Sequence, residues 1–167
     1  MSINAEQAEI LVQQLRVLLV DDNAFMRKVV RSLLGNIGVK TVFEAADGIA
    51  ALELIRSTTP DVIILDWEMP LLNGPELVRI VRSPGVFPTP DIPIIMLTAH
   101  GERWRIVESV KLGVNEFLCK PVSAKALLDR LISILLKPRE SVWVGNYYGP
   151  ARRTLAPKAP AAVPIPS

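Results

Sequence analysis

The chain has one cysteine and one histidine among its 167 residues. A single cysteine excludes an internal disulfide and fits a reducing cytoplasm, and we expect Cys119, in a short apolar run, to be a small core residue. A single histidine, His100, excludes a metal site built from several imidazoles. No apolar run approaches the ~18 residues of a membrane span. Acidic and amide side chains in residues 3–15 exclude a signal peptide, so the sequence predicts a cytoplasmic protein without a membrane anchor.

Neither sign of charge dominates, since the net charge is +2, but the charge is unevenly distributed. Residues 1–136 hold 14 basic and 16 acidic side chains, whereas residues 137–167 hold five basic and one acidic. The body of the chain therefore gives no reason to expect nucleic acid as a partner. Arg152 and Arg153 could touch DNA, but two arginines without a folded reading module do not make a nucleic-acid-binding protein.

Short apolar runs rich in valine and isoleucine alternate with amphipathic stretches. We expect strands at Val17–Val20, Thr41–Glu44, Val62–Leu65, Ile94–Leu97 and Glu116–Leu118. We expect helices near residues 24–35, 48–57, 75–83, 102–112 and 124–137. Unbroken apolar strands are typical of a parallel sheet that is buried on both faces. The alternation therefore predicts an α/β fold with right-handed crossovers.

Two segments lie outside this pattern. Residues 1–14 form an N-terminal extension in which an extra helix over residues 4–15 is possible by its apolar spacing. Residues 15–137 make the central domain. Residues 138–167 form a basic arm that contains six of the 14 prolines. The end of this arm is predicted to be extended.

Four charged residues follow strand-like runs: Asp21, Asp22 and Asp66 are acidic, and Lys120 is basic. Because the carboxyl ends of parallel strands open onto one crevice, we expect these charges to meet. Clustered carboxylates repel one another unless a cation joins them, and oxygen ligands favour Mg²⁺. Thr98 ends a further run and offers a hydroxyl to the same place. Such a site could accept a phosphoryl group, with Asp66 as the nucleophile.

A simpler reading exists for any one of these acids. A single aspartate after a strand is usually a turn former or helix N-cap, and Asp47 and Asp61 are assigned that way. Three acids, a lysine and a threonine at the same ends of four strands are much harder to explain by chance. The site interpretation is therefore favoured.

Residues 15–137 resemble the receiver domain of two-component response regulators. The matching stretches are Val20-Asp21-Asp22-Asn23, Leu65-Asp66-Trp67-Glu68-Met69-Pro70 with Asn73-Gly74, Leu97-Thr98-Ala99 and Lys120-Pro121. The resemblance implies a doubly wound, flavodoxin-like five-stranded parallel sheet of order 2-1-3-4-5. It also implies a cis bond before Pro121, as proline permits.

The resemblance assigns roles to the site residues. Asp66 would accept phosphate from a sensor histidine kinase or a histidine phosphotransfer protein. Mg²⁺ would be bound by Asp22, Asp66 and the backbone carbonyl of Glu68, with Asp21 assisting. Thr98 and Lys120 would contact the phosphoryl oxygens.

The resemblance also implies a switch and two positions that tune its lifetime. Phe117 would be the switch aromatic, whose ring rotates as Thr98 moves, so that phosphorylation biases a two-state equilibrium. Taken alone, Phe117 would be read as a simple core aromatic. The side chains of Glu68 and His100 would affect the water that attacks the acyl phosphate. His100 could equally be a solvated loop histidine.

The beginning of the arm carries an aromatic cluster. The residues concerned are Val142, Trp143, Val144, Tyr147 and Tyr148, and Gly145-Asn146 between them favours a hairpin. A lone hairpin is barely stable in water, so we expect it to dock on its own domain, a second subunit or a partner. A broad apolar stripe on the last helix favours a homodimer in which the arm contacts the other subunit.

The sequence thus predicts a stand-alone response regulator that is not an enzyme acting on other substrates. Its output would be altered protein contacts or onward phosphotransfer. One alternative is a Mg²⁺-dependent phosphatase or phosphotransferase with an aspartyl-phosphate intermediate, in which Glu68 would be the general acid. Another is a receiver that acts as a scaffold without phosphorylation.

Overall fold

The computed structural model describes residues 3–99 and 103–152. Its central strands are β1 (Arg16–Val20), β2 (Thr41–Ala45), β3 (Val62–Asp66), β4 (Ile94–Thr98) and β5 (Glu116–Cys119). Its helices are α1 (Ala5–Gln13), α2 (Ala24–Ile37), α3 (Gly48–Thr58), α4 (Gly74–Val81), α5 (Arg103–Leu112) and α6 (Ala124–Leu136). His100 and the arm beyond residue 152 lie outside the described residues.

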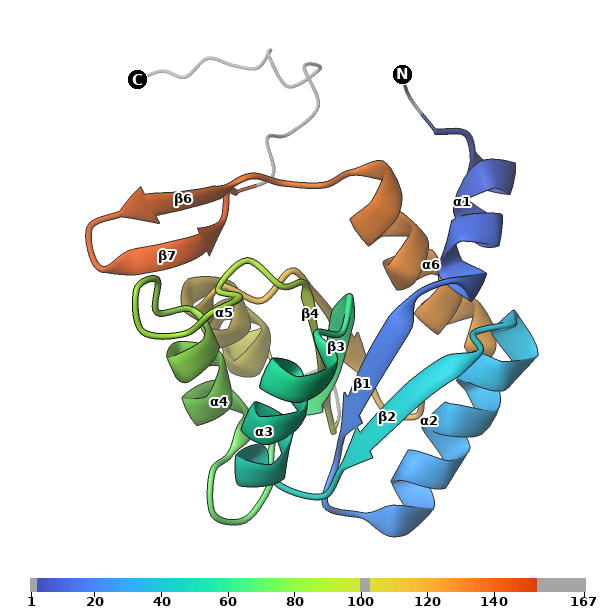
Figure 1. The fold of residues 1–167 in the computed structure, drawn as a ribbon, viewed down its shortest axis with the longest axis horizontal. Helices are drawn as coiled ribbons and strands as arrows, with labels where there is room; N and C mark the ends of the chain where they lie inside the picture. Colours follow the sequence, from blue (N-terminus) through green and yellow to red (C-terminus); the bar gives the residue numbers. More distant parts are fainter. Residues whose placement is uncertain (1–2, 100–102, 153–167) are drawn as a thin grey trace.

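The five central strands form one parallel sheet in the order β2-β1-β3-β4-β5. This order confirms the predicted doubly wound topology. All residues of β3 and β4 are buried, as expected for inner strands that are covered on both faces. The sheet therefore aligns the carboxyl ends of its strands along one edge, at the arrowheads of β1 and β2 in Figure 1.

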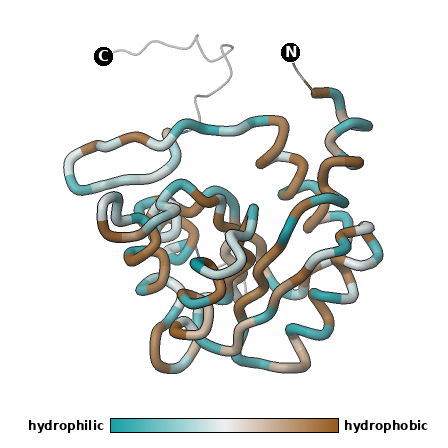
Figure 2. The backbone as a smooth tube through the Cα atoms, viewed as in Figure 1, coloured by the Kyte–Doolittle hydropathy of each residue, from teal (hydrophilic) through white to brown (hydrophobic). Residues whose placement is uncertain are grey.

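Helices cover both faces of the sheet, and each face has its own hydrophobic core. On one side, Leu18 and Ile63 pack with buried residues of α3 and α4. On the other side, Leu19 and Ile64 pack with buried residues of α2 and α6. Adjacent strand residues point to opposite faces, so the unbroken apolar runs fill both cores. Figure 2 shows this hydrophobic character along β1 and in α6.

The predicted N-terminal helix is confirmed as α1. Asn4 caps it by accepting a hydrogen bond from the Gln7 backbone, and the Gln7 side chain accepts one from the Asn4 backbone. Ala8 and Val12 are completely buried. Val12 belongs to the core shared with α6, and α1 lies beside α6 in Figure 1. The extension is therefore part of the folded unit.

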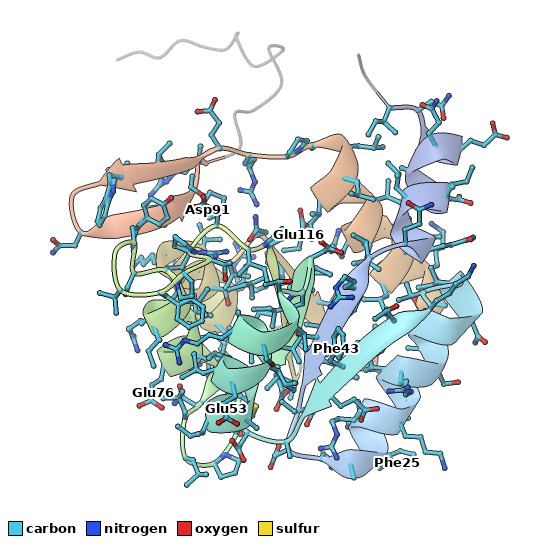
Figure 3. The ribbon with its side chains drawn as sticks, in the orientation of Figure 1. Phe25, Phe43, Glu53, Glu76, Asp91 and Glu116 are labelled. Atoms are coloured by element: carbon cyan, nitrogen blue, oxygen red, sulfur yellow. The ribbon has the colours of Figure 1, made fainter. Side chains whose placement is uncertain are left out.

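The arm begins with a hairpin of β6 (Ser141–Val144) and β7 (Tyr147–Pro150), joined at Gly145 and Asn146. The hairpin lies at the amino ends of the sheet strands, close to α5 (Figure 1). The Tyr148 hydroxyl donates a hydrogen bond to Asp91, which Figure 3 labels beside the hairpin. Docking on its own domain, one of the options that the sequence left open for the hairpin, is therefore observed at Tyr148.

The docking of β7 depends on two glycines. A Cβ on Gly149 would lie 2.9 Å from the Cα of Gly113, which is closer than real Cβ contacts allow.

Two large side chains of the hairpin, Trp143 and Val144, remain exposed, with 62% and 66% of their surface accessible. Contact of these two residues with a second subunit stays a prediction.

No helix among residues 3–99 and 103–152 combines the length and the apolar character that a membrane crossing requires. This finding agrees with the absence of long apolar runs in the sequence.

Candidate phosphoacceptor site

Three carboxylates meet where β1 and β3 end. Asp66 is the last residue of β3, and Asp21 and Asp22 directly follow β1. One carboxylate oxygen from each lies within 4.8 Å of the others. Asp21 and Asp66 are buried, whereas Asp22 is exposed. The prediction that these acids converge is therefore confirmed, because the parallel register brings the ends of β1 and β3 side by side.

Lys120 joins the cluster from the end of β5. Its ammonium donates a hydrogen bond to Asp66 Oδ1 at 2.7 Å and lies 3.6 Å from Asp21 Oδ2. The Lys120 backbone N–H donates to the Thr98 carbonyl at 2.8 Å, which ties the ends of β5 and β4 together. The bond between Lys120 and Pro121 is cis, as predicted.

The electrostatics of the cluster show a shortage of positive charge. Burial, and then the charges of Asp21 and Asp22, raise the pKa of Asp66 above its ordinary value, although the bond from Lys120 opposes the rise. Burial by itself lowers the pKa of Lys120, but its hydrogen bond and attraction to Asp66 raise the pKa overall. Lys120 therefore stays charged at neutral pH. It does not balance three carboxylates by itself.

The cluster has the donor set and one open ligand position for a hard cation. Asp21 Oδ1 accepts the backbone N–H of Asn23 at 2.9 Å. Asp21 Oδ2 is buried without a hydrogen-bond partner among the described residues. The Lys120 ammonium lies 3.6 Å from this oxygen but is hydrogen-bonded to Asp66, so a further cation would offset the remaining cost of burying the carboxylate. The residues present therefore fit a divalent cation such as Mg²⁺, which prefers oxygen ligands.

The predicted switch residues lie on the two strands that follow β3 in the sheet order, Thr98 at the end of β4 and Phe117 within β5. Thr98 ends β4, is 1% exposed, and has its hydroxyl 3.9 Å from the Cys119 sulfur. Phe117 is half-buried and packs against the core on the α3 and α4 side. Cys119 is exposed, so the prediction that it is a core residue is wrong. It is the final residue of an edge strand, where the covering helices no longer shield it.

Glu68 follows Asp66 by two residues, and its side chain is 71% exposed. Sequence reasoning assigned this residue roles but missed its partner, Arg105 of α5, which forms an ion pair with the Glu68 carboxylate. Arg105 also lies over the rings of Trp67 and Trp104. A tryptophan after the acceptor aspartate and a Trp-Arg pair at a helix start are the signals that could have suggested this contact.

The site opens into a cleft of about 540 Å³, and Trp67 and Glu68 belong to its lining. The three aspartates and Lys120 line it, and so does Arg105. Phosphate oxygens carry negative charge and bind where cations and ammonium groups are concentrated. The cleft can therefore present a carboxylate nucleophile beside two basic side chains and a cation site.

Comparison with known proteins identifies the class. Residues 17–132 match the family model of the response regulator receiver domain. The chain therefore belongs to this family, whose members act as phosphoacceptors. Helix α1 and the hairpin lie outside the matched residues.

Individual relatives agree. Chemotaxis protein CheY1 of Helicobacter pylori is 37% identical over 122 residues, which cover 72% of this chain and 97% of the relative. Chemotaxis protein CheY-3 of Vibrio cholerae is 34% identical over 125 residues, which cover 75% and 95%.

Solved structures show the same fold. The receiver domain of the Francisella response regulator 1452 superposes with a TM-score of 0.65 at 32% identity, covering 74% of this chain and 98% of that one. Vibrio cholerae CheY4 superposes with a TM-score of 0.65 at 34% identity, covering 73% and 99%.

Proposed function

We propose that this protein is a Mg²⁺-dependent phosphoacceptor switch that takes a phosphoryl group on Asp66. The observation that carries the proposal is the hydrogen bond of 2.7 Å from the Lys120 ammonium to Asp66. The carboxylate oxygens of Asp21 and Asp22 lie within 4.8 Å of an Asp66 oxygen at the same place. The phosphodonor would be a sensor histidine kinase or a histidine phosphotransfer protein. Membership of the receiver family and the similarity to chemotaxis proteins support this proposal.

In the proposed reaction, an ionised oxygen of Asp66 attacks the phosphorus of the donor. A P–O bond forms, the P–N bond of phosphohistidine breaks, and the imidazole leaves with the electron pair and is then protonated. Lys120 and Thr98 would contact the equatorial oxygens. Mg²⁺ held by Asp21, Asp22, Asp66 and the Glu68 carbonyl would neutralise charge on the transferring group.

The signal would leave the site through Thr98 and Phe117. Movement of Thr98 toward the phosphoryl group would let the half-buried Phe117 ring turn inward, which biases one of two conformations. The output would be altered protein contacts or onward phosphotransfer in the cytoplasm. The protein would then be a regulator that takes part in its own phosphorylation and dephosphorylation, not an enzyme for other substrates.

A homodimer remains part of the proposal. Trp143 and Val144 are exposed on the hairpin, so they can meet a second subunit while Tyr148 stays docked. Light scattering at micromolar concentration should give twice the monomer mass, and deletion of residues 138–167 should reduce it. A monomeric full-length protein would contradict this assignment.

One observation weakens the phosphatase alternative. A general acid must be available to protonate a leaving group, but the Glu68 carboxylate is paired with Arg105. The scaffold alternative is weakened because the three carboxylates converge within 4.8 Å and Lys120 pairs with Asp66. Slow or absent turnover of small phosphoesters is therefore expected.

The decisive experiment is intact-mass spectrometry after incubation with Mg²⁺ and acetyl phosphate. We expect one added phosphoryl group on the wild type, none on Asp66→Asn, and one on Asp61→Asn, whose aspartate lies before β3 at the other end of that strand. No transfer to the wild type would overturn the proposed function and favour a scaffold. Phosphorylation of Asp66→Asn would show that another residue is the acceptor.

A further inference from the structure

A cluster of four side chains stands at the mouth of the site, and the proposed chemistry does not use it. Trp67 and Trp104 meet edge to face, with ring centroids 5.8 Å apart and an interplanar angle of 84°. The Arg105 guanidinium carbon lies 5.2 Å from the centre of the Trp67 ring and 5.3 Å from that of Trp104. The same guanidinium pairs with the Glu68 carboxylate. We call these four residues the Arg105 cluster.

The cluster connects two separate elements at the phosphoacceptor. Trp67 and Glu68 are the residues that directly follow Asp66, whereas Trp104 and Arg105 belong to the first turn of α5. The Arg105 side chain is only 14% exposed, although Glu68 is 71% exposed. A guanidinium that packs against two aromatic rings keeps its position better than a free surface arginine, because cation–π contacts favour it there.

The position of Glu68 makes its charge important. Three carboxylates already outnumber Lys120 in the cleft, and Glu68 adds a fourth negative charge near its mouth. A phosphodonor is itself an anion, so an unbalanced Glu68 would oppose its entry. Arg105 lines the same cleft and supplies the compensating positive charge.

We propose that Arg105 is a positioning residue for phosphoryl transfer, which holds and neutralises the Glu68 carboxylate so that an anionic donor can enter. This inference rests on the proposed phosphoacceptor function. In this role Arg105 acts by binding the Glu68 carboxylate and does not contact the reacting atoms. Its consequence is that loss of Arg105 and loss of Glu68 should compensate for each other.

The test measures the phosphorylation rate constant with acetyl phosphate at saturating Mg²⁺ for four variants. These are Arg105→Gln, Glu68→Gln, the double variant, and Arg103→Gln as a matched control from the exposed start of the same helix. Arg105→Gln should lower the rate roughly threefold or more at low salt, and less at high salt, because salt screens the exposed Glu68 charge. The double variant should return to within about twofold of Glu68→Gln.

A second readout separates an electrostatic role from a merely structural one. Mg²⁺ affinity, followed by tryptophan fluorescence, should be unchanged or up to about twofold tighter in Arg105→Gln, because the uncompensated Glu68 attracts a cation. A disrupted fold would weaken Mg²⁺ binding and slow phosphorylation together. Arg105→Lys, which keeps the charge, should retain more of the rate than Arg105→Gln.

Each outcome has a distinct meaning. A double variant as slow as Arg105→Gln, a control as slow as Arg105→Gln, or weaker Mg²⁺ binding would overturn the role given to Arg105. A wild type that takes no phosphoryl group would instead overturn the proposed function.

Discussion

Buried charged groups at the two ends of the sheet differ in how far the protein itself supplies their hydrogen-bond partners. At the carboxyl end, three carboxylates face Lys120, and Asp21 Oδ2 has no hydrogen bond within the described part of the chain. At the amino end, each of the three guanidinium nitrogens of the buried Arg82 donates at least one hydrogen bond within the protein. A cation would lower the cost of burying the clustered carboxylates, whereas Arg82 is held by neutral acceptors within the chain. Like charges that outnumber their basic partner therefore set the candidate site apart from the buried arginine.

Arg82 is a buried charge that is held by hydrogen bonds from within the protein. Its Nε donates to the Gly113 carbonyl at 2.9 Å, and its Nη1 donates to the carbonyls of Pro90 and Ile92, each at 2.7 Å. Its Nη2 donates to Asn115 Oδ1 at 2.9 Å. Burial lowers the pKa of Arg82 to about 10, so it remains protonated at neutral pH. One side chain thereby joins α4 to the segments that precede β4 and β5.

The hairpin is fastened to the same segment. Arg139 donates hydrogen bonds to the carbonyls of Asn115 and Ala151, so it connects the start of β5 with the end of β7. The Ala151 N–H in turn donates to the Glu140 carbonyl at 2.8 Å. The amino end of the sheet is therefore closed by polar contacts within the chain, while Trp143 and Val144 stay exposed for the proposed second subunit.

The largest effect should come from removing Arg82. Arg82→Met would remove four hydrogen bonds and leave the carbonyls of Pro90, Ile92 and Gly113 without this donor, so we expect the free energy of unfolding to fall by about 3 kcal/mol. Urea unfolding would measure this change. Arg79→Met, at an exposed position of the same helix, is the control and should change stability by less than about 0.5 kcal/mol. Equal effects of the two substitutions would show that the buried contacts are not important.

An intermediate effect should follow from Gly149→Ala. The new Cβ would meet the Cα of Gly113 at 2.9 Å, so the hairpin must shift away from α5. We expect a loss of about 1 to 2 kcal/mol and faster hydrogen exchange in residues 141–150. Gly35→Ala meets nothing within 4 Å and lies inside α2, so it should stabilise the protein by about 0.5 kcal/mol. Unchanged exchange in the hairpin would contradict the docking.

The smallest effect concerns the carboxyl end and has the opposite sign. The pKa of Asp66 is higher in the folded protein than in the unfolded chain. Stability is therefore lost as the pH rises from the ordinary pKa of an aspartate through the raised pKa of the folded state. Without Mg²⁺ at neutral pH, Asp66→Asn should therefore be more stable than the wild type by about 1 kcal/mol, since lost repulsion outweighs the lost Lys120 contact. Urea unfolding between about pH 4 and 7 should show a weaker pH dependence for the variant.

Mg²⁺ and a surface control complete this test. Added Mg²⁺ should stabilise the wild type more than Asp66→Asn, because a ligand stabilises the state that binds it. Asp129→Asn, on the exposed side of α6, should match the wild type in its pH dependence. A wild type more stable than Asp66→Asn in the absence of Mg²⁺ would show that the cluster is already balanced by Lys120.

Local pattern was sufficient for most of the fold and for the centre of the site. The apolar runs predicted all five strands, because residues buried on both faces must be hydrophobic at every position. Asp21, Asp66 and Lys120 could be placed together from the sequence, because parallel strands end at a common edge. The N-terminal helix was also predicted, from the spacing of its apolar residues.

Contacts between distant segments were decided only by the tertiary structure. The pairing of Glu68 with Arg105 joins residues 37 positions apart, and Tyr148 with Asp91 joins residues 57 apart. Exposure at the end of β5 likewise contradicted the core assignment of Cys119. Periodicity and the positions of strand ends were enough to predict the helices and strands of the sheet, the convergence of the three carboxylates with Lys120, and the family. Which long side chains meet, and where the hairpin docks, depend on packing between elements that no local pattern records.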